Sequence, residues 1–284
     1  MIENLIRAWV ADEKNIRIMF FVSVFLLMAL WEWKASRRNQ KIPKTHRWPN
    51  NLAMTLLNTL VVRILFPGSA LWASYLAASY RIGFFNWVEV PFGVSAVLTI
   101  SNLDWVIYYQ HRAFHALPWL WKIHRVHHTD LEVDVTTGMR FHPLEAVLSM
   151  CVKSLAIVAL GAPPGAVFLF ELILNTASLF NHANIRMPRI LANILKLFIV
   201  TPDMHRIHHS VIPREFGSNF GFIFSWWDRL FGTYRAEPEK GQEEMTLGLG
   251  IFNDLKYLKG DQMLMQPFMD KEGRFDLAHF IRPD

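Results

Sequence analysis

The chain has 284 residues, of which 52% are hydrophobic and 14% aromatic, and its formal net charge is +5. This length fits one large domain or two small ones, and the apolar fraction is high for a soluble protein. The basic residues do not form one stripe, so the charge does not indicate a nucleic-acid-binding protein. A single cysteine, Cys151, excludes a disulfide framework and a thiolate metal site.

Residues 1–17 are predicted to form a short amphipathic segment at the start of the chain. Residues 18–31 are apolar apart from Ser23 and are predicted to form a first membrane span. Trp31 and Trp33 flank this block. One block of this length is short for a span, but several such blocks with aromatic flanks favour membrane helices over a soluble core.

A basic segment follows the first span and contains no acidic residue. Its members are Lys34, Arg37, Arg38, Lys41, Lys44 and Arg47. Short basic loops beside a span lie on the cytoplasmic side. This rule accounts for the net charge and places the segment inside the cell.

The apolar segment at residues 52–80 is interrupted by Arg63 and by Pro67-Gly68, so it is either one kinked span or a hairpin. A third span is predicted at residues 93–109. Residues 144–180 are broken by GAPPG at 161–165, which predicts two helices that meet at a tight turn. A single crossing at 52–80 brings every histidine group to the cytoplasmic side, whereas a hairpin would place them outside against the charge rule. The single crossing is therefore predicted.

Three groups of histidines recur along the chain: HRAFH at 111–115, HRVHH at 124–128 and HRIHH at 205–209. On a helix, residues three and four apart share a face, whereas adjacent residues diverge by about 100°. One metal cannot readily take both members of an adjacent histidine pair from one helix, but two metals side by side can each take one. The spacing therefore indicates a binuclear centre.

The type of ligand limits which metals the centre could bind, because nitrogen-only coordination suits iron, zinc, copper or nickel rather than magnesium or calcium. A structural zinc site closes at four ligands, and these groups hold eight histidines, with His182 an expected ninth. The Glu-x-x-His pattern of ferritin-like di-iron proteins and the zinc-protease motif H-E-x-x-H are both absent. Chance clustering at a membrane surface would not explain why the spacing recurs. Two irons in a histidine-rich shell would suit oxygen activation.

Three further residues are candidates near such a centre. Asp104 is the only charge in the predicted third span, and it is expected to orient a ligand histidine or bind a nearby arginine, with a buried ion pair as the structural alternative. His142 in FHPLE is a partner of a ligand or an extra ligand. Asn219 in SNFG could reach the centre, but a helix cap is the preferred interpretation.

This set of motifs resembles the fatty acid hydroxylase and sterol desaturase superfamily, whose pattern is HRxxH, HxxHH and a second HxxHH. The surrounding DWVIYYQHR, RFHPLE, NHANI and WWDRLFGTY are similar to its bacterial branch, and the likeness covers about residues 50–235. The resemblance implies a membrane-embedded non-haem di-iron enzyme that hydroxylates or desaturates lipids with O2 and external electrons. By position it implies these metal ligands: His111, His115, His124, His127, His128, His205, His208 and His209, joined by His182 of NHANI because the family often places a ligand between its second and third boxes.

The prediction is therefore an all-α, polytopic membrane helical bundle, one domain over residues 1–284, with a cytoplasmic histidine-rich cap that holds two irons. Recombinant material could carry zinc instead. The lipid substrate enters from the bilayer, and a separate ferredoxin or b-type cytochrome supplies electrons, because no nicotinamide, flavin or c-type haem motif is present. The expected location is a bacterial inner membrane. The alternative is a membrane metal-binding or metal-transport protein without oxygenase activity. For the oxygenase, the sequence leaves open which lipid is attacked and whether the lipid is hydroxylated or desaturated.

Overall fold

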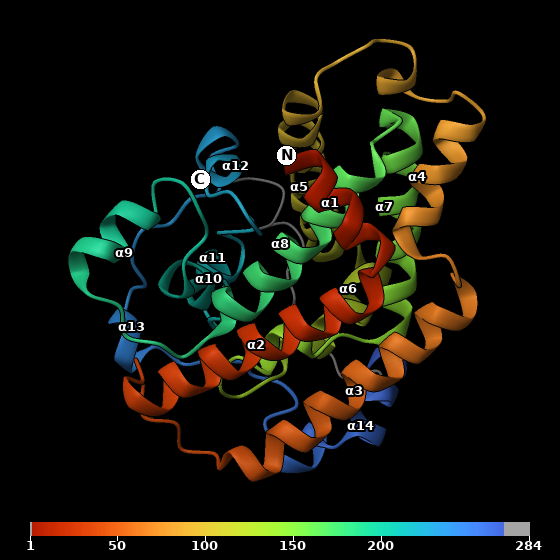
Figure 1. Cartoon of the computed structure of the whole chain (residues 1–284). Coiled ribbons are helices and arrows are strands. Elements are labelled where there is room, and N and C mark those ends of the chain that lie inside the picture. Colours follow the sequence, from red (N-terminus) through yellow and green to blue (C-terminus); the bar gives the residue numbers. More distant parts are fainter. Residues whose placement is uncertain (1, 270–284) are drawn as a thin grey trace.

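The computed structural model describes residues 2–269, and within that range the chain is helical, with isolated β-bridges but no sheet (Figure 1). The helices are α1 (Ile2–Ala11), α2 (Glu13–Lys34), α3 (Lys44–Leu65), α4 (Ser69–Ser79), α5 (Phe92–Ala116), α6 (Pro118–His128), α7 (Pro143–Leu160), α8 (Pro164–His182), α9 (Arg189–Leu195), α10 (Pro202–His208), α11 (Pro213–Phe216), α12 (Trp226–Leu230), α13 (Gly241–Glu244) and α14 (Gly260–Met265). Four 3₁₀ turns accompany them: η1 (Phe84–Asn86), η2 (Thr137–Met139), η3 (Leu255–Leu258) and η4 (Gln266–Phe268).

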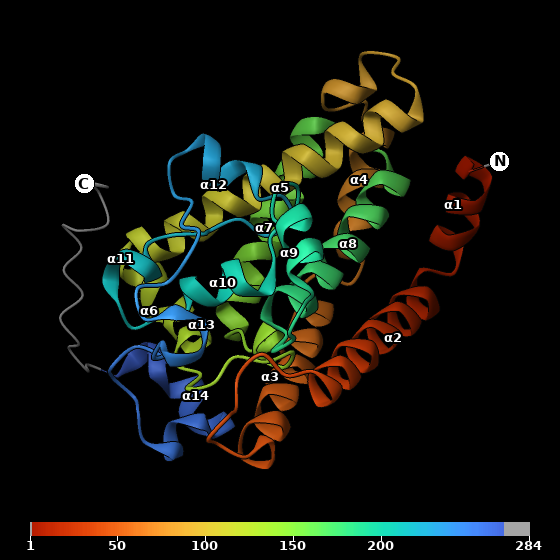
Figure 2. The same ribbon diagram turned by 90° about the vertical axis from the view of Figure 1, so that its left-hand side faces the viewer.

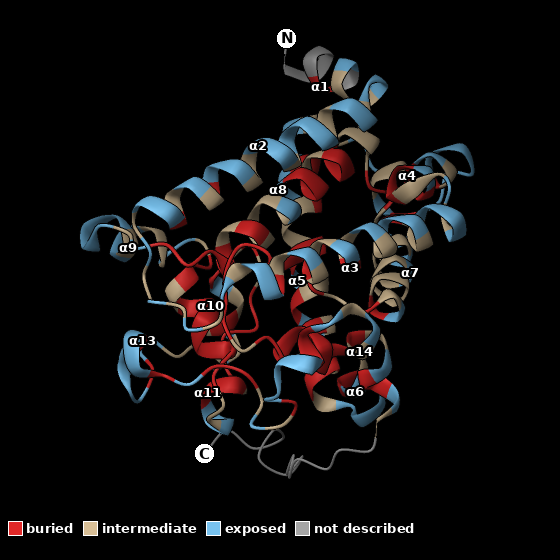
Figure 3. Ribbon diagram, turned by 90° about the horizontal axis from the view of Figure 1, so that it is seen from below, coloured by how far each residue is buried: buried red, intermediate tan, exposed pale blue. Residues whose placement is uncertain are grey.

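By length and composition, four helical segments of the described chain could cross a membrane: α2, α3 together with α4, α7 and α8. Large apolar side chains on these helices remain exposed, for example Leu26 at 59%, Leu56 at 72% and Leu155 at 71%. Figure 3 shows the long helices α2 and α3 with mostly exposed residues, whereas buried residues gather around α6, α10 and the loops between them. The predicted helical membrane bundle is confirmed in this form.

The predicted third span at residues 93–109 is helical, as part of α5, but α5 is not one of the four apolar segments. Polar residues explain the difference, because α5 carries Ser95, Thr99, Asn102 and Asp104 within its first four turns. Of these, Ser95, Thr99 and Asp104 are buried against protein.

The segment at 52–80 is one kinked unit, α3 followed by α4, and not a hairpin. Asn58 Nδ2 donates to Phe141 O across 2.8 Å, just before α7 begins, whereas the Ser74 hydroxyl donates to Ala162 O, just after α7 ends. The two helices therefore run the length of α7 in the same direction. The break falls at Phe66–Gly68, where Pro67 cannot continue the helical hydrogen bonds.

The predicted turn at GAPPG is also confirmed. Gly161 ends α7 with φ +63°, a left-handed conformation that glycine adopts without steric cost, and Pro164 starts α8. A side chain at Gly161 would also collide with Asn86 Nδ2 and with the backbone oxygen of Ile82. The close approach fixes the loop after α4 against this turn.

Helix α8 joins the apolar bundle to the buried cap. It packs against α2, α4 and α5 and, near its C-terminus, against α10 (Figure 2). A hydrophobic core that includes Leu103, Ile157, Phe168 and Phe170 holds α5, α7 and α8 together. This packing brings the C-terminal ends of α5 and α8 to the same level as the short helices α6 and α10.

Candidate metal centre

The histidines lie near the C-terminal ends of four helices: α5, α6, α8 and α10. Helices α6 and α10 are short, and each begins with a proline at its first position, Pro118 and Pro202. Proline favours a helix start because its missing N–H would be unsatisfied there anyway. The prolines therefore fix where each helix begins, and so which histidines occupy its last turn.

The structure brings all nine predicted histidines together in two groups. Within each group, one ring nitrogen from every histidine lies within 4.8 Å of the others. The first group is His111, His115, His124, His128 and His208, and the second is His127, His182, His205 and His209. Each adjacent pair is divided between the groups, as the helical spacing predicted for two metals side by side. Both groups could hold a metal ion.

Hydrogen bonds orient four of these rings. The Nδ1 atom of His111 lies 2.9 Å from Phe220 O, and that of His124 lies 2.7 Å from Glu145 Oε1. The Nδ1 atom of His182 lies 2.7 Å from Ser178 O, and that of His208 lies 2.8 Å from Ser218 O. A carbonyl or carboxylate oxygen only accepts, so Nδ1 carries the proton in each ring and donates it. Nε2 is left with a lone pair that can bind a metal.

Nε2 atoms of neighbouring rings face one another. His182 Nε2 lies 3.1 Å from His127 Nε2 and 2.9 Å from His205 Nε2, and His128 Nε2 lies 3.2 Å from His124 Nε2. Among residues 2–269, no hydrogen-bond partner reaches Nε2 of His111 or of His208. In His111 and His208 this nitrogen is a buried acceptor without a donor, which is costly, and a bound cation removes that cost. The residues present therefore fit a metal in each group.

Electrostatics favour the metal-binding form of the rings. Burial, reinforced by the surrounding imidazoles, holds the pKa of His128, His205 and His209 well below the usual histidine range, and it lowers the pKa of His208 to about 3. These four rings are therefore neutral at pH 7, and none of them has to lose a proton before a metal binds.

Glu145 is a site residue that the sequence analysis missed. It lies in the first turn of α7, and its Oε1 accepts a hydrogen bond from His124 Nδ1. Its second oxygen, Oε2, is buried without a partner in the described chain. The sequence could have indicated Glu145, because it lies in the RFHPLE motif, three residues after the candidate His142.

A buried ionic network behind the histidines was also missed. Arg47 Nε and Nη2 donate to Asp130 across 2.7 and 2.8 Å, and Nη1 donates to Asp134 across 2.6 Å. Burial alone would raise the pKa of Asp130, but the Arg47 guanidinium holds it down at about 2. Asp130 follows the last histidine of α6 by two residues, so the network fixes the end of that helix to α3.

The prediction for Asp104 is wrong. Its carboxylate accepts hydrogen bonds from the backbone N–H groups of Ile223 and Phe224, each across 3.0 Å, and from Trp227 Nε1 across 2.9 Å. None of these donors is a histidine or an arginine, so the ion-pair alternative fails too. Asp104 secures the loop that contains Phe220, whose carbonyl holds His111.

His142 and Asn219 also lie outside both histidine groups. His142 caps α7, because its Nδ1 accepts from Leu144 N across 3.1 Å. Asn219 neither caps a helix nor reaches the centre. Its side chain donates to Met204 O and accepts from Arg235 N, both across 2.9 Å, and so ties α10 to the segment after α12.

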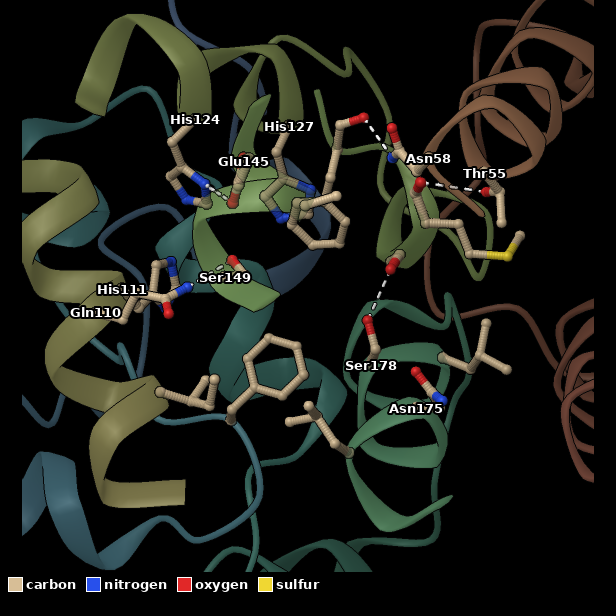
Figure 4. A pocket seen from close by; sticks show the side chains of 18 of the residues that line it. Thr55, Asn58, Gln110, His111, His124, His127, Glu145, Ser149, Asn175 and Ser178 are labelled. Carbon is tan, nitrogen blue, oxygen red and sulfur yellow. Dashed lines mark hydrogen bonds and ion pairs between the residues drawn. The ribbon is translucent and has the colours of Figure 1, made fainter. Parts of the chain in front are cut away.

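A cavity of about 300 Å³ adjoins the histidines (Figure 4). His111, His124, His127 and His205 form part of its wall. Helices α2, α3, α7 and α8, which belong to the four segments that could span a membrane, supply much of the rest. The cavity therefore extends from the apolar helices to the two histidine groups.

Comparison with known proteins agrees with this geometry. Residues 96–233 match the family model described as fatty acid hydroxylase. The chain is 27% identical over 294 residues to ornithine lipid hydroxylase OlsE of Rhizobium tropici, which covers 96% of this chain and 83% of OlsE. It is 28% identical to alkylglycerol monooxygenase of Homo sapiens (64% of this chain, 39% of that protein) and 30% identical to that of Danio rerio (59% and 37%), so it spans well under half the length of these two. No solved structure matches the chain.

Proposed function

Because residues 96–233 belong to the fatty acid hydroxylase family, we propose that this protein is a membrane-embedded di-iron oxygenase that hydroxylates a C–H bond of a lipid with O2 and external electrons. The observation that carries the proposal is the pair of nitrogen-only groups beside one cavity. Hydroxylation is preferred to desaturation because OlsE is a hydroxylase and the two alkylglycerol relatives are monooxygenases by name.

In this proposal each histidine group holds one iron ion, and when bound the pair supplies the oxygen activation that side chains cannot perform. The protein's own groups orient the ligands. Glu145 and the backbone carbonyls of Ser178, Ser218 and Phe220 keep the protons on Nδ1 and the Nε2 atoms turned inward. The nine rings are each at most 7% exposed, which excludes bulk water from the centre.

The lipid would enter from the bilayer through the cavity. Phe21, Leu174 and Leu179 contribute apolar surface from α2 and α8, and the histidines lie on another part of the wall. A chain inserted between these helices would bring its carbon atoms to the centre without crossing water. The dense, buried arrangement of histidines favours retained metal over a transport path, whose ligands must release the ion.

Electrons would come from a separate ferredoxin or b-type cytochrome that docks on the cytoplasmic side. The basic segment after α2 supports that side, because Arg37 Nε lies 3.4 Å from Asp203 Oδ1 at the start of α10. The basic residues and the histidine helices therefore share one face, and the positive-inside rule supports the proposal that this face is cytoplasmic, with the protein in a bacterial inner membrane.

The test is metal analysis of gently purified protein, with lipid profiling of cells with and without the gene, under oxygen and without it. We expect close to two irons per chain and an oxygen-dependent hydroxylated lipid. The variant His127→Ala should lose the product and the iron of its own histidine group, whereas His46→Ala, an exposed histidine outside the groups, should keep both. Zinc alone in a recombinant sample calls for reloading with iron, because zinc outcompetes ferrous iron at nitrogen sites. Iron-loaded protein that leaves the lipids unchanged would overturn the oxygenase and favour the metal-binding alternative.

A further inference from the structure

Three carboxamide side chains line the cavity beside the histidines: Asn58 on α3, Gln110 on α5 and Asn175 on α8 (Figure 4). Asn58 and Asn175 lie in segments apolar enough to span a membrane. Polar side chains there are costly and are functional candidates by default. Their presence in the wall shows that the cavity is not built for hydrocarbon alone.

Two of these amides use their nitrogen and leave their oxygen unsatisfied. Asn58 Nδ2 donates to Phe141 O across 2.8 Å, and Gln110 Nε2 donates to Ser149 Oγ across 2.7 Å. Asn58 Oδ1 and Gln110 Oε1 are buried, and neither has a partner among the residues that the structure describes. An unsatisfied buried acceptor destabilises the protein, because it has lost its hydrogen bond to water without a replacement. A ligand that donates a hydrogen bond would remove this cost.

Asn175 has a different environment from the other two. It is exposed, and none of the hydrogen bonds within residues 2–269 uses its side-chain amide. Together with Phe21 and Leu179, it lines both the main cavity and a small side cavity between α2 and α8. Figure 4 places it across the cavity from His111 and His124. Its amide is therefore available to a molecule that enters between these helices.

We propose, on the basis of the proposed function, that the substrate is a lipid with a hydrogen-bond donor, an amide N–H or a hydroxyl, close to the attacked carbon. The carboxamide oxygens need a donor, and a plain acyl chain, an ester or an ether has none. Asn175 is the positioning residue, since its amide binds this polar group while the neighbouring carbon lies at the histidines. The attack then falls near the polar part of the lipid and not in the middle of its chain.

The test is calorimetric binding of two matched probe pairs to the full chain in detergent, loaded with zinc so that no turnover occurs. The first pair is N-hexadecanoylglycine and its ester isostere, hexadecanoyl glycolate, which differ only in the N–H group. The second pair is 2-hydroxyoctadecanoic and octadecanoic acid, which differ only in the hydroxyl. We expect the donor-bearing member of at least one pair to bind up to about tenfold more tightly, the effect of one net hydrogen bond. The pair that shows the preference identifies the donor.

Asn175→Leu should abolish that preference, so that the two members of the pair bind with about equal affinity. The matched control is Thr176→Val on the next position of α8, whose hydroxyl bonds to Leu172 O and lines only the side cavity, and it should keep the preference. No preference in the natural protein, for either pair, would overturn the proposal without any variant. A preference that survives in folded Asn175→Leu would overturn the positioning role of Asn175, because Asn58 Oδ1 or Gln110 Oε1 would then accept from the donor. Because the measurement needs neither iron nor oxygen, its failure leaves the oxygenase proposal standing, and absence of oxygenase activity leaves the binding result standing.

Discussion

His124 donates from Nδ1 to Glu145 Oε1 across 2.7 Å, and this contact joins α6 to the first turn of α7. Both side chains are buried, at 3% and 5% exposed. A carboxylate behind a ligand imidazole fixes the tautomer and raises the basicity of the ligating nitrogen. The contact therefore links the metal affinity of the centre to a residue that belongs to neither histidine group.

Replacing Glu145 tests this link. Glu145→Ala should weaken metal binding by about 10–100-fold, the usual effect of losing such a partner, whereas Glu145→Gln should lose less because its amide oxygen can still accept from His124. The measurement is the dissociation constant for Fe²⁺ or Zn²⁺ by competition with a chelator. Glu239→Ala is the control, because Glu239 forms an exposed pair with Arg214. Equal affinities in Glu145→Ala and Glu239→Ala would contradict the assigned role.

The division of adjacent histidines predicts different metal stoichiometries in double variants. His127→Ala with His209→Ala removes two ligands from one group and should leave about one metal per chain, because the other five histidines remain. His127→Ala with His128→Ala damages both groups and should leave close to none. Metal content per chain, measured with circular dichroism to verify helicity, separates the two. The same stoichiometry in both double variants would speak against two separate sites.

Removing the metal should destabilise the protein, because metal binding to the native state adds directly to its stability. At a free metal concentration of 100 times the dissociation constant, the gain is about 2.7 kcal/mol. At this chain length, that corresponds to a fall in melting temperature on the order of 5–10 °C when a chelator is added. Thermal unfolding in detergent with and without chelator measures it. A chelator-independent melting temperature would mean that the histidines pack stably without metal.

The Arg47–Asp130 pair should be a large contributor to stability, since both side chains are fully buried. Asp130→Ala leaves the Arg47 charge partly uncompensated and should lower the free energy of unfolding by about 3–5 kcal/mol. Arg214→Ala, at an exposed pair, should change it by less than about 1 kcal/mol. Chemical denaturation in detergent compares the two. Similar losses would show that water reaches the pair in solution.

The sequence by itself determined the local geometry of the site. Residues at i, i+3 and i+4 share a face on any helix, whereas adjacent residues diverge, so the division of adjacent histidines between two groups followed from spacing alone. The turn at GAPPG and the kink near Pro67 were equally local, because proline and glycine restrict their own backbone wherever they occur.

Only the tertiary structure decided the partners. Glu145 lies 21 positions from His124, and Asp104 lies 119 from the backbone N–H of Ile223 that it binds. The predicted partner of Asp104 was wrong because a buried carboxylate can be satisfied by any donor, and packing, not periodicity, brought the loop after α11 to it. The cavity and its three amides arise likewise from the way α3, α5 and α8 pack, since burial and contact between distant segments depend on the whole fold, whereas helical periodicity depends only on neighbouring residues.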